Sequence, residues 1–174
     1  MDVLDTVFEV IDMRSFSNLW YWIALAVLWS TTTHWVMGVP FDMLRKAKRF
    51  GGEAQTDVEA LVRIYSTRLI SALEPGAVWI VTLASFWMSI LAILAFVYNL
   101  EFAQAVFLLT APMALVIWLS LRCARRIMAD EGEGLALHRR LTIHRRFLQA
   151  TGMVSIFITA MYGMWQNLNI SILN

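Results

Sequence analysis

The sequence predicts an all-α membrane protein, an antiparallel bundle of four transmembrane helices. Of its 174 residues, 59% are hydrophobic and 16% are charged, with a mean hydropathy of +0.62, unlike a soluble globular domain. Two apolar runs, 77–98 and 102–121, are separated only by the turn 99–101. Each run is long enough to cross a hydrocarbon core of ~30 Å at ~1.5 Å per residue. So short a turn makes the two runs antiparallel.

Residues 1–18 are predicted to form an outer amphipathic tail. Val3–Met13 places apolar residues on one face at helical spacing, and four acidic residues lie on the other face. A helix this short is marginal in water, so we expect its apolar face to rest on the bilayer interface or on a protein. A frayed polar tail is the alternative. The tail lacks a basic n-region, so no secretory signal peptide is predicted.

The first span is predicted over residues 19–39. It opens with the triplet Trp20, Tyr21 and Trp22, which is typical of an interfacial aromatic anchor. Residues 40–75 form a polar loop that contains the basic run 45–49. A capping box at 56–59 indicates the start of an amphipathic helix that reaches Leu73. We expect this helix to lie along the membrane or against the second basic loop.

The remaining chain supplies three further spans. The second is predicted over 76–98, the third over 102–121, where Pro112 predicts a kink, and the fourth over 147–168. Residues 122–146 form a second loop, in which the third helix runs on and a returning helix leads into the fourth span. Small side chains recur in the fourth span at spacings of three and four, which indicates a close-packing face. They are Gly152, Ser155, Thr159 and Gly163.

The basic residues predict the orientation. The loop 40–75 holds six of them and the loop 122–146 holds seven, and the only other one is Arg14. The positive-inside rule therefore makes both loops cytoplasmic and puts both termini outside a bacterial inner membrane. The clusters either contact anionic lipid headgroups or dock an acidic protein partner. Their members are Arg45, Lys46, Lys48, Arg49, Arg122, Arg125, Arg126, Arg139, Arg140, Arg145 and Arg146.

Reactive chemistry is sparse. The only ionisable residue within the predicted spans is His34, so a charged transport path or a dimetal site lacks the residues that it needs. His34 and His144 are weak candidates for a bis-histidine haem, and hydrogen-bonded interfacial histidines are the favoured interpretation. Cys123, set among arginines, is either a reactive thiolate or, as we favour, a cysteine without a catalytic role. We expect no catalytic residues, no cofactor, no metal and no nucleic-acid partner.

Three stretches carry a family resemblance: FEVIDMRSFSNLWYWIALAVL, TTHWVMGVPFDM and NLEFAQAVFLL. With them the chain resembles a small four-span inner-membrane protein family of Rhodobacter-type alphaproteobacteria, often labelled a component of the SufBCD iron–sulfur assembly complex. The resemblance covers most of the chain. It implies a membrane tether for soluble assembly machinery, and it carries no functional residue over.

Three functions are compatible with these patterns. The first is a non-enzymatic accessory or scaffold protein that docks a protein partner, or forms a homo-oligomer, in a larger membrane complex. The second is a small transport or channel subunit with a path lined by hydroxyls, including those of 31–33, Ser85, Ser89 and Thr159. An enzyme acting on lipid is third, and the absence of a carboxylate or histidine pair within the spans argues against it.

Overall fold

The computed structural model describes residues 15–129 and 134–172. The predicted N-terminal helix and the glycine-rich turn at 130–133 lie outside the described residues. Within the described ranges, the chain folds almost entirely into helices. The elements are the 3-10 turn η1 (Ser15–Ser17), α2 (Leu19–His34), β1 (Trp35–Val36), β2 (Val39–Pro40), α3 (Phe41–Phe50), α4 (Glu53–Leu73), α5 (Ala77–Phe96), α6 (Glu101–Ala129) and α7 (Gly134–Ile172).

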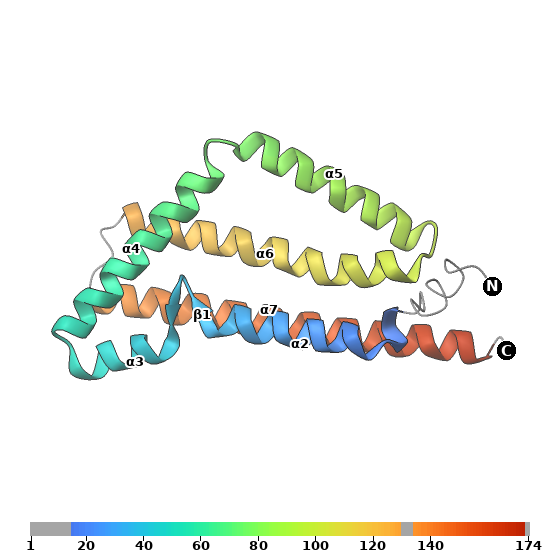
Figure 1. The fold of residues 1–174 in the computed structure, drawn as a ribbon, viewed down its shortest axis with the longest axis horizontal. Helices are drawn as coiled ribbons and strands as arrows, with labels where there is room; N and C mark the ends of the chain where they lie inside the picture. Colours follow the sequence, from blue (N-terminus) through green and yellow to red (C-terminus); the bar gives the residue numbers. More distant parts are fainter. Residues whose placement is uncertain (1–14, 130–133, 173–174) are drawn as a thin grey trace, which may run out of the picture.

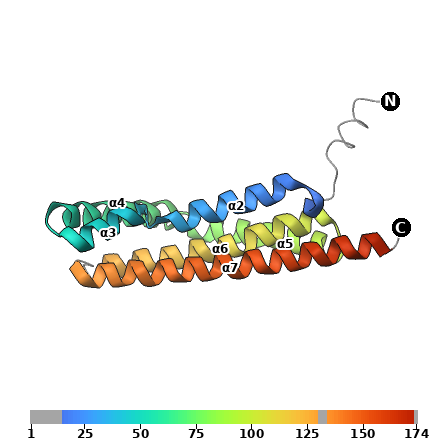
Figure 2. The same cartoon turned by 90° about the horizontal axis from the view of Figure 1, so that it is seen from below.

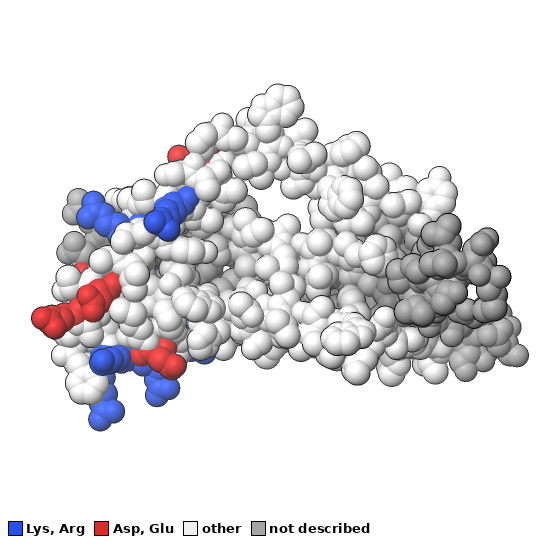
Figure 3. All heavy atoms as spheres, in the orientation of Figure 1, with Lys and Arg blue, Asp and Glu red and all other residues white. Residues whose placement is uncertain are grey.

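Three helices, α5, α6 and α7, are long and apolar enough to cross a membrane. Helices α6 and α7 lie side by side, and α2 runs along α7 (Figures 1 and 2). Helices α3 and α4 gather at one end of this body, and η1 and the turn between α5 and α6 lie at the other end (Figure 1). Charged side chains are seen over α3 and α4 in Figure 3, whereas the visible body beyond them is uncharged.

Two predicted continuities are confirmed. Helix α6 runs unbroken from Glu101 through Pro112 into the basic segment and ends at Ala129. Helix α7 carries the second basic cluster directly into the predicted fourth span without an interruption. Each helix therefore joins an apolar stretch to a basic stretch without a break.

The predicted first span was too long. Helix α2 begins at Leu19, where Asn18 accepts a hydrogen bond from the Trp20 amide, but it ends at His34 instead of reaching Val39. Beyond it, Trp35 pairs with Pro40 in a two-stranded hairpin. The turn of that hairpin, Met37–Gly38, has positive φ at both residues, which a continuing helix excludes.

The predicted start of the amphipathic helix was also wrong. Helix α4 begins at Glu53, directly after two glycines with positive φ, and Thr56 lies inside its first turns. The glycine break and not the capping box sets the boundary. The buried face of α4 contains Val58, Val62 and the polar Ser66, whereas Leu61 and Tyr65 are each 40% exposed.

The main core lies at the charged end. There α3, α4, the hairpin and the adjoining ends of α6 and α7 surround one cluster of buried apolar side chains, and we call this assembly the loop domain. The cluster is formed by Val36, Met37, Val39, Leu44, Ala47, Val58, Val62, Ala124, Ile127, Leu137 and Leu141. The two predicted polar loops thus fold with each other into one packed unit.

Small residues bring α2 and α7 together. Gly152 is buried against Trp29, and a Cβ at this glycine would lie 2.8 Å from the indole ring. Gly163 is buried in the same way against Phe16 and Trp22. The side chains of Ser155 and Thr159, between the two glycines, are buried as well. The aromatic rings of η1 and α2 therefore occupy the space that glycine leaves on α7.

Helix α5 packs against α6 through its C-terminal half, and its start is exposed. Leu91, Ala95 and Ala103 pack together near the turn, and the amide of Gln104 donates to the Ala95 carbonyl at 2.9 Å. At the start of the helix, the four consecutive residues 78–81 are each at least 41% exposed. Successive helical side chains point about 100° apart, so this part of α5 is exposed on every side. Figure 3 shows the opening that separates it from the body.

The Gly152 contact yields a prediction about stability. Replacing Gly152 with Leu should lower the free energy of unfolding by about 2 kcal/mol, because the new side chain overlaps the buried indole of Trp29. Thermal unfolding of the detergent-solubilised protein measures the change. The control Ala150→Leu, at an exposed position of the same helix, should stay within about 0.5 kcal/mol. Equal effects of the two substitutions would contradict close packing at Gly152.

Candidate functional site

Helix α3 presents the first basic cluster to the outside. Leu44 and Ala47 anchor the helix in the core of the loop domain, and the glycines that follow end it. Arg45, Lys46, Lys48 and Arg49 occupy the remaining faces and are exposed. The sequence predicted these residues as a contact surface, and the fold presents all four on a helix fixed by its buried side.

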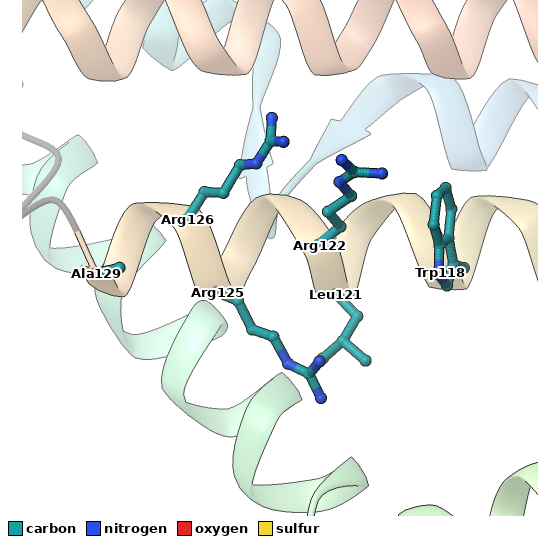
Figure 4. A pocket seen from close by; sticks show the side chains of 6 residues that line it. All are labelled: Trp118, Leu121, Arg122, Arg125, Arg126 and Ala129. Atoms are coloured by element: carbon teal, nitrogen blue, oxygen red, sulfur yellow. The ribbon is translucent and has the colours of Figure 1, made fainter.

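The arginines of α6 point in two directions. Arg125 extends towards α4, where its Nε lies 3.6 Å from an oxygen of Glu74 (Figure 4). Arg122 and Arg126 extend on the opposite side of the helix (Figure 4). The guanidinium of Arg122 lies 5.3 Å from the ring centroid of Trp118, one turn earlier, which is a cation–π contact.

The arginines of α7 also differ from one another. Arg139 and Arg146 are exposed. Arg140 donates from Nη1 to the Arg126 carbonyl at 2.7 Å and so links α7 to α6. Arg145 stacks on Phe41, with its guanidinium 3.4 Å from the ring centroid, and ties α7 to α3. Arg145 was predicted as a surface contact, but the structure uses its side chain within the loop domain.

A groove of about 690 Å³ runs between α6 and α7 at this end. Its walls include the arginines at 122, 126 and 140, together with Cys123 and His144. Burial raises the pKa of the Cys123 thiol to about 11, although Arg140 and Arg126 act in the opposite direction. A raised pKa works against the reactive thiolate that the sequence left open at Cys123.

The two candidate haem ligands occupy different environments. His34 is exposed at the last position of α2, beside the ring of Trp35. His144 is buried, its Nε2 lies 3.4 Å from the Ser120 hydroxyl, and burial lowers its pKa to about 4. Among the described residues, no group of three or more histidine, cysteine, aspartate or glutamate side chains is arranged to hold a metal ion.

A polar network that no sequence pattern predicts joins α4 to α7. One oxygen of Glu59 accepts from the Gly134 amide at 2.8 Å and from Gln55 Nε2 at 2.6 Å. These two bonds lower the pKa of Glu59, the bond from Gln55 having the larger effect. The oxygen of Gln55 in turn pairs with Nε2 of His138. Glu59 thereby binds the start of α7, where a negatively charged carboxylate interacts favourably with the helix dipole.

The three side chains of the predicted aromatic anchor lie in two different environments. Trp20 is 74% exposed, as an interfacial side chain would be. The Tyr21 hydroxyl donates to the Ala105 carbonyl at 3.3 Å, and Trp22 Nε1 donates to the Phe16 carbonyl at 3.0 Å. Two of the three rings therefore serve packing between helices.

The predicted hydroxyl path does not converge on one place. The Thr32 and Thr33 hydroxyls donate to carbonyls one turn earlier in α2, at Leu28 and Trp29. Ser89 does the same on the exposed surface of α5, whereas Thr159 is buried in α7. These hydroxyls thus either donate to backbone carbonyls of their own helix or lie far from one another on different helices.

Comparison with family models, with curated proteins and with solved structures finds no match to this chain.

The buried His144 yields a prediction about pH. Its pKa is lower in the folded state than the usual 6.5, so the unfolded chain takes up a proton at higher pH. The stability due to neutral His144 is complete above about pH 6.5 and is lost as the pH falls towards about 4.

We expect the replacement His144→Gln to reduce the loss of unfolding free energy between pH 7 and pH 4.5 by about 1–2 kcal/mol. Thermal unfolding in detergent at a series of pH values measures this. The exposed His34→Gln serves as the matched control and should leave the profile unchanged. Parallel pH profiles for wild type and His144→Gln would contradict a buried neutral imidazole.

Proposed function

We propose that this protein is a non-enzymatic scaffold of the bacterial inner membrane that docks an acidic soluble protein on the basic side of its loop domain. It crosses the membrane four times, with the loop domain in the cytoplasm and both termini outside. The proposal rests on one observation: the loop domain presents four exposed basic side chains on α3, and none of them forms a salt bridge with a described carboxylate.

The structure of α3 supports the docking role. Its four basic side chains are exposed, and the one salt bridge between described residues joins Arg125 to Glu74. The positive-inside rule alone requires only basic residues near the spans and no folded domain. A fixed helix whose exposed cations form no salt bridge within the described part of the chain favours a complementary acidic surface, which electrostatic attraction steers into place.

Helix α2 supports the fourth crossing. It lies along α7, carries no Asp, Glu, Lys or Arg, and begins beside the start of α6 at the uncharged end of the body (Figure 1). Sixteen helical residues extend about 24 Å, which falls short of the hydrocarbon core by about 6 Å. Residues of η1 and of the hairpin, which continue from its two ends, supply the remaining length.

A narrower form of the proposal rests on the family resemblance of the sequence. In that form the docked partner belongs to the iron–sulfur assembly machinery, and this protein tethers it to the membrane. With a single cysteine, the chain supplies too few thiolates to hold a cluster by itself.

A transport function has weaker support. A polar path needs its hydroxyls on facing helices, but Ser89 lies on exposed α5 and Thr159 is buried in α7. We therefore retain the scaffold as the proposed function.

The four-span topology predicts which positions are labelled from outside the cell. In a Cys123→Ala background, single cysteines at Ser17 and Tyr98 should react with a membrane-impermeant maleimide in intact spheroplasts. A cysteine at Lys46 should react only after lysis. All three positions are exposed in the structure. Labelling at Tyr98 with protection at Ser17 would mean that α2 does not cross, and labelling at Lys46 would mean the inverse orientation.

Docking on α3 predicts a partner within reach of Lys46. A photo-crosslinking amino acid at this position in living cells should capture one discrete acidic protein. The double variant Arg45→Gln/Arg49→Gln should reduce the crosslinked product by at least about fivefold, because two charges of the docking surface are lost.

The matched control is Arg63→Gln/Arg68→Gln, which removes the same charge from exposed positions of α4. It should leave the crosslink within about twofold of wild type. The labelling assay above verifies that both variants keep the wild-type orientation. A crosslink that is missing, or that the α3 variant leaves unchanged, would overturn docking on α3.

A further inference from the structure

We propose that the groove between α6 and α7 binds the phosphate of an anionic membrane phospholipid, with Arg122 and Arg126 as its ligands. This is a single defined site, distinct from a general attraction of basic loops to the membrane surface. It is also separate from the docking surface of α3.

The groove changes in character along its length. Its walls are basic at the end away from the apolar body, where Arg122 and Arg126 of α6 meet Arg140 of α7. Leu119 of α6 and the pair Ile143 and Phe147 of α7 line the other end. Each helix therefore passes from cationic to apolar side chains in the same direction, towards the spans.

The two α6 arginines are oriented into this region. Arg122 and Arg126 lie one turn apart and extend on the side of α6 opposite to Arg125 (Figure 4). Arg125 is paired with Glu74, whereas neither Arg122 nor Arg126 has a salt bridge with a described carboxylate. Two guanidinium groups one helical turn apart can hold one phosphate by forked, charge-assisted hydrogen bonds.

No negative charge on the described groove walls competes for these arginines. Cys123 is a neutral thiol because burial raises its pKa to about 11, and His144 is a neutral imidazole because burial lowers its pKa to about 4. Trp118 lies over Arg122 on the membrane side, where an indole prefers the boundary between headgroups and chains.

The apolar end selects a lipid over a soluble phosphate. A free anion would leave Leu119, Ile143 and Phe147 without a ligand, whereas the acyl chain of a phospholipid would cover them. The volume of about 690 Å³ is within the range of small-molecule sites and holds a headgroup with the start of its chains. The chains continue into the bilayer, where the groove opens towards the spans.

Native mass spectrometry of the purified full-length protein tests the site. With a mixture of phosphatidylglycerol and phosphatidylcholine, the protein should retain one phosphatidylglycerol and release phosphatidylcholine. The variant Arg122→Gln/Arg126→Gln should weaken this retention by about tenfold. The control Arg139→Gln/Arg146→Gln removes equal charge from exposed positions of α7 outside the groove and should stay within about twofold of wild type.

Three outcomes would overturn the site. They are equal retention of phosphatidylcholine, an equal loss in the control variant, and displacement of the lipid by millimolar inorganic phosphate, which would identify a soluble anion. If size exclusion shows that the double variant is misfolded, Arg122→Gln alone should weaken retention by about threefold. The measurement uses no protein partner, so its result is independent of docking on α3.

Discussion

The structure depends on two helices that pass from an apolar to a basic environment without a break. A charge in hydrocarbon is costly, so the boundary between the two environments fixes the depth of α6 and α7. Beyond that boundary, Ala124 and Ile127 on α6 and Leu137 and Leu141 on α7 remain buried and provide the surface on which α4 packs. The loop domain is therefore built on the ends of two continuous helices, and its position follows from theirs.

Helix α5 shows what happens where this support is missing. It joins α4 through Pro75-Gly76 and packs against α6 through its C-terminal half, from Met88 to Ala95. Near its start, the pair Glu74–Arg125 is more than half exposed and contributes little to stability. Lipid chains are as apolar as the side chains of α5, so burial gives this helix no reason to close against α6. Its inclination follows from the two connections at its ends, and the opening beside it is compatible with lipid or with another helix.

Sequence reasoning identified the helices well and their ends poorly. Apolar length and charge placement specify α5, α6 and α7 because the cost of burying charge in lipid dominates other terms. The end of α2 and the start of α4 depend instead on backbone turns with positive φ, at Met37–Gly38 and Gly51–Gly52. Hydropathy carries no signal for the hairpin turn. For the start of α4, the capping box at 56–59 was a stronger indication than the glycine pair. The sequence left the amphipathic helix either on the membrane or against the second basic loop, and the structure has the second arrangement. The core that it shares with α3 and the hairpin was not predicted, because it combines five segments that each look marginal alone.

The basic residues show why a count of charges can predict the orientation of the chain in the membrane but not the location of a binding site. Orientation depends on which side of the membrane a charge lies, so every arginine in a loop has equal weight. A site depends on the direction of each side chain. Arg125 meets a carboxylate, Arg145 covers Phe41, and Arg122 lies over Trp118 and lines the groove. The spacing of Trp118 and Arg122, four residues apart on one helix, is the part of this pattern that the sequence does contain. The contact across helices, in which Arg140 binds the Arg126 carbonyl, requires the fold, and both of these residues line the groove.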